Sequence, residues 1–353
     1  MLILGIETSC DETAAAIVEV TDNRATVLSN IVSSQIALHA QWGGVVPNLA
    51  AREHLKNILP VIETALVKAK KKSSDLDLIA VTNGPGLIPA LLIGTTTAKT
   101  LAYLWKKPLI GIHHIEGHIY ANFVSADIAK LNFPILALVV SGGHTQLVLM
   151  RKHLSYEIIG ETVDDAVGEA FDKVARILNL GYPGGPVVAK LADAFLEKNK
   201  KFQITLPRPM LKSNNFNFSF SGLKTAVLYA TKKNPENLQN PIYISEMCQE
   251  FQSAVTDVLI AKTIRAAKKY LPKTILLAGG VSANQALRKK LKLSVEENLE
   301  NINCLVPEFL YSLDNATMIA MAGYYRWENL KNKATSKNTW QDLETSASLK
   351  LKK

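Results

Sequence analysis

Residues 2–32 read LILGIETSCDETAAAIVEVTDNRATVLSNIV, and this stretch decides the fold. It begins with a short apolar run typical of a buried strand, and a polar loop follows at residues 7–12. Residues 13–20 and 25–32 are rich in Ala, Val, Ile and Thr and flank the turn TDNR, which predicts a hairpin. The expected unit is therefore a strand, a polar loop and an antiparallel hairpin.

The same order of elements recurs further along the chain. Residues 135–140 are apolar, SGGH follows at residues 141–144, and another strand is expected at residues 145–150. A strand that ends in a glycine turn occurs once in each half, at residues 76–86 and 274–281. We therefore expect an α/β protein with two lobes, duplicated β-sheet domains and a ligand in the interlobe cleft.

Helices are expected between the strands. Residues 246–270 carry apolar residues at helical spacing, and residues 164–178 have the acidic start that suits a helix N-terminus. Residues 328–353 are rich in Lys, Ser and Thr, which predicts a poorly packed basic tail. The expected domains are a first lobe of residues 1–130 plus 312–327 and a second lobe of residues 131–311.

The composition is that of a globular protein, with 48% hydrophobic and 20% charged residues in a chain of 353. Lys and Arg number 40 against 31 Asp and Glu, and the net charge of +9 permits a nucleic acid as ligand. Three widely separated cysteines indicate a reducing compartment. The N-terminus lacks the basic segment of a secretory signal, and no uninterrupted apolar stretch reaches ~20 residues, so we expect a cytoplasmic protein that does not enter the membrane.

Four of the seven histidines fall within residues 113–144, three of them in the segment HHIEGH. His114 and His118 are four residues apart, so a helix would place both on one face, where two imidazoles can share a metal ion. A zincin helix has its glutamate directly after the first ligand, whereas Glu116 comes two residues after His114. The pattern therefore favours a metal site over a metallopeptidase, with capping or packing as the alternative role of the histidines.

Three glycine loops lie in one half of the chain, with the sequences SGG at residues 141–143, PGGP at 183–186 and GGVSAN at 279–284. Glycine lets backbone N–H groups approach a phosphate or ribose closely, so the three loops together favour a nucleotide. The chain has no Walker A motif and no GxGxxG after a strand, so the predicted site is neither a P-loop nor a Rossmann site.

Six acidic residues lie in or beside expected loops: Asp11, Glu12, Asp164, Asp165, Asp172 and Asp314. Carboxylates in a cleft bind ribose hydroxyls, ligate metals or act as bases. Helix capping is the simpler explanation for Asp164 and Asp314, because each precedes an expected helix.

One long stretch of the chain is basic. Residues 262–292 contain nine basic residues and no acidic one. Such a stretch attracts a polyphosphate backbone, although a charge run is more often a solvated face. No aromatic ladder of the RNA-binding type accompanies it, so charge alone leaves nucleic-acid contact open.

Ten motifs occur in the order typical of one family. They are IETSCDET (6–13), GVVP (44–47), NGPGL (83–87), HHIEGH (113–118), SGGHT (141–145), GEAFDK (168–173), YPGGP (182–186), FSFSGLKT (218–225), GGVSAN (279–284) and Asp314-Asn315-Ala316. On these motifs the chain resembles the tRNA N6-adenosine threonylcarbamoyltransferase (TsaD) family, formerly called O-sialoglycoprotein endopeptidases. The resemblance covers about residues 1–327, and FSFSGLKT resembles the bacterial and organellar branch.

The resemblance implies an actin-like, sugar-kinase-like (ASKHA) two-lobe fold. It also implies transfer of a threonylcarbamoyl group from threonylcarbamoyl-AMP to N6 of the adenosine 3′ of the anticodon, position 37, in tRNAs that read codons beginning with adenine, which forms t6A. In bacteria the family works with a paralogous partner, TsaB, and a small ATPase, TsaE.

Carried over residue by residue, the resemblance implies one metal ion, Fe²⁺ or Zn²⁺, held by His114, His118 and Asp314. It links Asp11 and Glu12 to catalytic activity, and our own hypothesis is that one of the two helps accept the amine proton. It implies that the donor is held by Val139, Val140, Ser141, Gly142, Gly143, Asp172, Gly185 and Asn284.

Three other functions stay open. An ATPase or phosphotransferase of the same fold superfamily would need magnesium and a γ-phosphate acceptor, but not His114 or His118. A metallopeptidase would cleave a glycoprotein. A non-catalytic scaffold is disfavoured, because both histidines, Asp314 and the glycine loops are all present.

Overall fold

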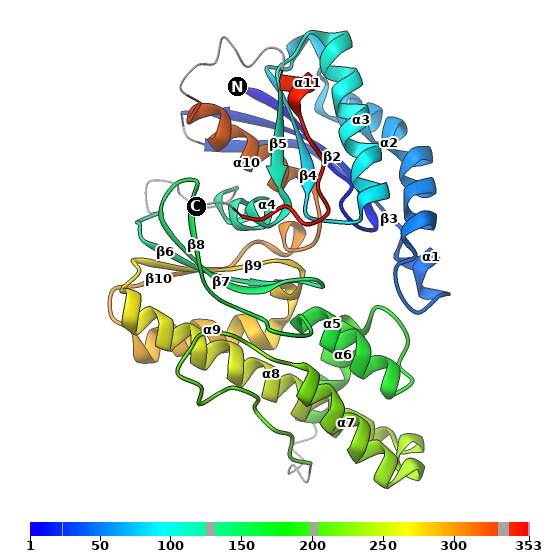
Figure 1. The fold of residues 1–353 in the computed structure, drawn as a ribbon, viewed down its shortest axis with the longest axis vertical. Helices are drawn as coiled ribbons and strands as arrows, with labels where there is room; N and C mark the ends of the chain where they lie inside the picture. The colour runs from blue at the N-terminus through cyan, green and yellow to red at the C-terminus, as the bar shows by residue number, and fades with distance from the viewer. Residues whose placement is uncertain (23, 125–130, 198–203, 331–338, 352–353) are drawn as a thin grey trace. The chain divides into compact units, whose positions relative to one another are not determined.

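The computed structural model describes residues 1–22, 24–124, 131–197, 204–330 and 339–351 (Figure 1). Across these residues no helix has both the length and the apolar character needed to cross a membrane.

The chain divides into two compact units. Unit 1 comprises Met1–Asn132, Lys152–Tyr156 and Pro307–Lys353, and unit 2 comprises Phe133–Arg151 and Glu157–Val306. The domain boundaries expected after residues 130 and 311 remain a prediction. They assign Lys152–Tyr156 to the second lobe, whereas this segment groups with unit 1.

Unit 1 is built on a five-stranded mixed sheet of order β3-β2-β1-β4-β5. Its strands are β1 (Leu2–Glu7), β2 (Glu12–Thr21), β3 (Arg24–Ser34), β4 (Leu78–Gly84) and β5 (Leu109–His113). β1 pairs antiparallel with β2 and parallel with β4. β2 also pairs antiparallel with β3, so the hairpin predicted from residues 13–32 is confirmed. The helices of this unit are α1 (Ile36–Ala40), α2 (Pro47–Ala69), α3 (Ile88–Trp105), α4 (His114–Tyr120), α10 (Ala316–Glu328) and α11 (Thr339–Asp342).

Side chains that alternate along β1 separate the two faces of this sheet. Leu4 and Ile6 belong to a buried cluster with Ile58 and Ile62 of α2 and Ala98 of α3. The residue between them is Gly5, and because neighbouring side chains of a strand point to opposite faces, it faces α10. A Cβ on this glycine would lie 2.2 Å from the carbonyl oxygen of Ala316. The glycine therefore lets the start of α10 lie against the sheet.

Unit 2 repeats this topology. Its sheet has the order β10-β9-β6-β7-β8, with strands β6 (Ile135–Val140), β7 (Thr145–Lys152), β8 (Ser155–Glu161), β9 (Thr274–Ala278) and β10 (Asn303–Leu305). The central strand β6 pairs antiparallel with β7 and parallel with β9, as β1 does with β2 and β4. The duplication predicted from the sequence is therefore confirmed.

The helices of unit 2 form its main core with one face of β6. They are α5 (Val167–Ile177), α6 (Gly184–Glu197), α7 (Ser221–Lys233), α8 (Pro241–Tyr270) and α9 (Gln285–Asn298). Leu136, Leu138 and Val140 of β6 lie in one buried cluster with Phe251 and Val255 of α8. The helices predicted at residues 164–178 and 246–270 are confirmed as α5 and α8.

The prediction of a poorly packed tail is wrong for residues 339–351. The ring of Trp340 packs edge-on against Tyr103 of α3, with the ring centroids 5.3 Å apart. The backbone N–H of Ser346 donates to the carbonyl of Asn83 at 2.9 Å. The segment has few apolar side chains, but backbone hydrogen bonds to the end of β4 and the loop after it help to hold it against unit 1. The rest of the predicted tail beyond Leu330 lies outside the described residues.

Candidate metal centre and substrate loops

The two histidines of the predicted metal site lie one turn apart on α4, which begins where β5 ends. The side chain of His113 accepts a hydrogen bond from the N–H of Ile115 at 3.2 Å and so caps the first turn of the helix. The rings of His114 and His118 have centroids 4.6 Å apart. The helical spacing predicted for this pair is confirmed.

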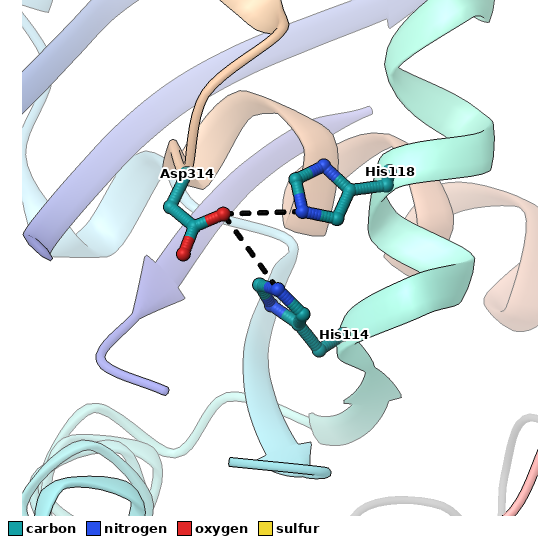
Figure 2. A group of neighbouring side chains, drawn as sticks. All are labelled: His114, His118 and Asp314. Atoms are coloured by element: carbon teal, nitrogen blue, oxygen red, sulfur yellow. Dashed lines mark ion pairs between the residues drawn. The ribbon is translucent and has the colours of Figure 1, made fainter. Parts of the chain in front are cut away.

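Asp314 completes the group from a distant part of the chain. Its Oδ1 lies 3.1 Å from Nε2 of His118 and 3.6 Å from Nε2 of His114 (Figure 2). The candidate ligand atoms of the three residues all lie within 4.8 Å of one another. Asp314 is not the cap of α10, because Asn315 takes that role by accepting from the N–H of Met318 at 3.0 Å.

The donor set fits a transition metal. Two imidazoles and one carboxylate are ligands that zinc and iron(II) accept, and three protein ligands leave positions open for a substrate. His118 is 1% exposed, yet neither of its ring nitrogens has a well-aligned hydrogen bond within the described chain. Asp314 lies 3.1 Å from Nε2 of His118 without an aligned hydrogen bond, so an ion held between the two would satisfy this buried nitrogen.

Acidic groups surround the histidines. Burial disfavours an imidazolium at His114, but Asp314 and Glu7 outweigh it and raise the pKa of His114 to about 9. Burial likewise works against ionisation of Asp314, but His114 and His118 lower the pKa of this carboxyl to about 2. The site therefore favours positive charge, which suits a cation-binding centre.

Asp11 directly precedes β2 and Glu12 is its first residue, in the same unit as the histidines. The loop before them is held by His54, whose Nε2 lies 3.0 Å from the carbonyl of Cys10 and whose Nδ1 lies 2.8 Å from the hydroxyl of Thr13. Burial, together with the charges of Asp11 and Asp314, raises the pKa of Glu12 well above its ordinary value. A carboxylate with a raised pKa binds a proton more readily than an ordinary glutamate, which suits a general base.

In unit 2 the loop Ser141–Gly143 forms a tight turn against the start of α5. The N–H of Ser141 donates to the carbonyl of His144 at 2.8 Å, and the N–H of Gly168 donates to the carbonyl of Ser141 at 3.1 Å. A Cβ added at Gly142, Gly143 or Gly185 would meet no atom within 4 Å. Packing in the described chain does not explain these three glycines, and each leaves room for a ligand.

The other predicted substrate residues behave differently. The side chains of Val139 and Val140 are fully buried in β6, so only their backbone is available to a ligand. Oδ1 of Asp172 accepts from the N–H of Gly184 at 2.7 Å, which fixes the glycine loop. The amide of Asn284 caps α9 through Leu287 and donates to Gln252 at 2.7 Å.

The remaining acidic candidates have structural roles. Asp164 accepts from the hydroxyls of Ser219 and Ser221 and from the N–H of Phe220 at 2.8 Å, beside the start of α7. Asp165 pairs with Lys173 and Lys224 at 2.7 and 3.3 Å. Both residues hold the segment FSFSGLKT.

The basic stretch 262–292 is not one solvated face. Lys262 is buried, and its ammonium donates to the hydroxyl of Ser213 at 2.9 Å. Lys290 pairs with Asp257, and Arg288 donates to the carbonyl of Ser282. The exposed members of the stretch are Lys268, Lys269, Lys273, Lys289 and Lys292.

The peptidase interpretation finds no support in Glu116. Its fully buried carboxylate is bound by the guanidinium of Arg326, with 2.8 Å between Oε2 and the nearer terminal nitrogen. A carboxylate engaged in this way is not free to activate a water at the histidines.

Sequence reasoning missed Glu7, which touches His114. It belongs to the expected polar loop at residues 7–12, but its partners Thr82 and His114 come from β4 and α4, and only the packing of these elements brings them to it.

Comparison with known proteins decides the family. The family model for TsaD, tRNA N6-adenosine threonylcarbamoyltransferase, matches residues 26–321. The chain belongs to this family. A Persephonella marina protein of that name is 51% identical over 93% of this chain and 91% of its own length. A Bacillus subtilis protein of the same name is 50% identical over 98% of this chain and 96% of its own length. The chain is thus an acyltransferase that acts on N6 of adenosine in tRNA, as its resemblance implied.

Solved structures confirm the actin-like, ASKHA-type fold. A structure of full-length HypF in the phosphate- and nucleotide-bound form has a TM-score of 0.57 at 13% identity, and the match covers 94% of this chain and 47% of HypF. The activator of the 2-hydroxyisocaproyl-CoA dehydratase from Clostridium difficile, with bound ADPNP, has a TM-score of 0.51 at 13% identity and covers 94% and 99% of the two chains.

Proposed function

We propose that this enzyme takes its threonylcarbamoyl group from threonylcarbamoyl-AMP and delivers it to N6 of the adenosine at tRNA position 37, with a metal ion held by His114, His118 and Asp314. The observation that carries this proposal is the approach of three ligand atoms, from two elements far apart in sequence, to within 4.8 Å of one another. Fe²⁺ is the metal we expect, and Zn²⁺ is the alternative, because both accept this donor set.

The loops of unit 2 are the proposed binding site of the adenylate donor. Support comes from Gly142, Gly143 and Gly185, which leave open space where side chains would stand. Backbone N–H groups in such loops donate to phosphate oxygens. Asp172 and Asn284 act through the loops they hold, and Val139 and Val140 supply the strand end from which the first loop starts.

The chemistry requires help at both partners. N6 of adenosine is a poor nucleophile because its lone pair is delocalised into the purine. As N6 attacks the carbamoyl carbon, the bond from that carbon to the phosphate oxygen breaks and AMP departs with the electron pair. The amine proton passes to Asp11 or Glu12, and the raised pKa of Glu12 favours Glu12. The metal would supply a Lewis acid that holds a donor oxygen and stabilises developing negative charge.

Partners are proposed on the surface of unit 1. Leu55 and Leu59 of α2 are 66% and 60% exposed, and Leu92 and Tyr103 of α3 are 48% and 63% exposed. Large exposed apolar side chains on neighbouring helices suit a protein interface. We propose that they meet a TsaB-like paralogue, that a TsaE-like ATPase acts with the pair, and that the assembly works on tRNA in the cytoplasm.

A transfer assay tests the proposal. The full chain, with and without the two partner proteins, is given threonylcarbamoyl-AMP and tRNA, and t6A is measured by mass spectrometry of the nucleosides together with the metal content. We expect t6A from the wild type and loss of both metal and product in the double variant His114→Ala plus His118→Ala. Transfer that survives in this variant would reject the metal role. ATP hydrolysis without transfer would favour the phosphotransferase alternative.

A further inference from the structure

Glu7 is a fully buried carboxylate at the end of β1. Its Oε1 accepts from the N–H of Ser9 at 2.5 Å. Its Oε2 accepts from the hydroxyl of Thr82 at 2.6 Å and lies 3.2 Å from Nδ1 of His114. Two of its three neighbours, the N–H of Ser9 and the hydroxyl of Thr82, therefore donate to it.

Both oxygens of this carboxylate are thus held as acceptors, Oε1 by the backbone N–H of Ser9 and Oε2 by the hydroxyl of Thr82. The remaining neighbour of Oε2 is Nδ1 of His114, which this geometry places to donate its N–H to Glu7. The other ring nitrogen, Nε2, is the one that faces Asp314, at 3.6 Å.

We propose that Glu7 is a positioning residue that keeps the proton of His114 on Nδ1 and so presents the Nε2 lone pair to the metal ion. This inference rests on the metal site proposed above. Ligating histidines commonly give their second N–H to such an outer partner, which fixes the orientation of the ring and raises its basicity. His118 has no corresponding partner in the described chain, so Glu7 acts on one ligand only.

Glutamine is the informative substitution at Glu7. An amide is nearly the same size as a carboxylate but supplies one acceptor oxygen instead of two. The backbone N–H of Ser9 can only donate, so it would take the amide oxygen. The amide NH₂ would then face Nδ1 of His114 and favour the tautomer with the proton on Nε2, which has no lone pair left for the metal.

The experiment measures Zn²⁺ affinity of the purified full chain by competition with a chromophoric chelator. We expect Glu7→Gln to weaken Zn²⁺ binding by roughly 10–100-fold, the range known for outer partners of ligating histidines. Ser9→Ala removes the second neighbour of Nδ1, the hydroxyl of Ser9 at 3.1 Å. It should change the Zn²⁺ affinity by less than about 3-fold, because the charged carboxylate of Glu7 is a stronger acceptor than a neutral hydroxyl. Unchanged affinity in Glu7→Gln, or a larger loss in Ser9→Ala, would overturn the proposal.

A spectroscopic measurement separates positioning from general damage. With ¹⁵N-labelled histidine and both proteins metal-free, at a pH where the His114 ring is neutral, the wild type should show the ring proton on Nδ1 and Glu7→Gln should show it on Nε2. A proton on Nε2 in the metal-free wild type would overturn the proposal.

Glu116→Gln is the matched control, because it removes another fully buried carboxylate of unit 1, one that pairs with Arg326 instead of a histidine. It should lower thermal stability while leaving the tautomer of His114 unchanged. A wild type that binds neither Zn²⁺ nor Fe²⁺ would reject the proposed metal site. A wild type that binds the metal, together with a Glu7→Gln variant that binds it equally well, would reject only the role of Glu7.

Discussion

Nε2 of His113 lies 3.0 Å from the carbonyl oxygen of Leu349, a residue 236 positions further along the chain. The same segment pairs with the loop after β4, because Gly86 donates to the carbonyl of Ala347 at 3.2 Å. His113 in turn caps the helix that carries both candidate metal ligands. The C-terminal segment therefore supports the strand end from which the metal centre starts.

Gly84→Ala should displace this segment. A Cβ at Gly84 would lie 2.1 Å from the carbonyl oxygen of Ser346, and the residue has φ +151°, which favours glycine. We expect a loss of about 1–3 kcal/mol in the free energy of unfolding, as for overpacked sites, and faster proteolysis near residues 343–349. Chemical denaturation and limited proteolysis measure the two effects. Gly222→Ala, where an added Cβ meets nothing within 4 Å, is the control. Wild-type protection of the segment in Gly84→Ala would contradict this account.

Asp314→Asn and Asn315→Ala separate metal binding from helix capping. The first removes the only carboxylate among the three candidate ligands, so Zn²⁺ affinity should fall more than about 100-fold, beyond the effect of an outer partner. The second removes the cap of α10 and should cost about 1 kcal/mol of stability with little change in affinity. Chelator competition and thermal unfolding of both variants check this contrast. Equal metal affinities in the two variants would rule out Asp314 as a ligand.

The pH dependence of transfer should report Glu12. Burial, Asp11 and Asp314 raise its pKa, so Glu12 holds its proton to higher pH than an ordinary glutamate and becomes a base only above that raised pKa. The single-turnover rate should therefore fall as the pH is lowered through this range. Asp11→Asn removes one negative charge, which lowers the pKa of Glu12 and moves the acidic limb to lower pH.

Glu12→Gln should abolish most of the transfer rate, and the residual rate should no longer fall as the pH is lowered. Transfer at a normal rate in both Asp11→Asn and Glu12→Gln would remove the proposed proton acceptor. An acidic limb that stays in place in Asp11→Asn would show that another group titrates.

Gly142→Ala should separate folding from donor binding. Its Cβ would meet no atom of the described chain within 4 Å, so stability should stay within about 0.5 kcal/mol of the wild type. The same methyl group would occupy the proposed adenylate site, so AMP should bind more weakly. In contrast, a Cβ at Gly168 would lie 2.8 Å from the backbone of Ser141, so Gly168→Ala should lower both the stability and the affinity for AMP. Calorimetry with AMP and thermal unfolding provide the measurements. Unimpaired AMP binding in Gly142→Ala would place the donor elsewhere.

Local patterns predicted much of the fold. Alternating and continuous apolar runs in residues 2–32 and 135–150 correspond to β1, β2, β3, β6 and β7. The two strand–loop–hairpin segments revealed the duplication because each is encoded by neighbouring residues. The spacing of His114 and His118 was informative for the same reason, since one helical turn is a local distance.

Patterns failed where long-range contacts decide the environment. Lys262 lies in a basic run, but the loop that contains Ser213 covers its ammonium. The segment 339–351 has a polar composition, yet it is ordered by backbone pairing with Asn83 and Gly86, which composition does not reveal.

By itself, the sequence determined the two α/β halves, the helical pair of histidines and, through its motifs, the family. The resemblance implied Asp314 as a ligand, but only the tertiary structure shows that its side chain, and not that of Asn315, turns toward the histidines, and that Glu7 stands behind one of them. The physical reason is distance along the chain. Secondary structure depends on residues a few positions apart, whereas a ligand set and the charges that tune it are assembled from separate elements once the sheet and its helices have packed.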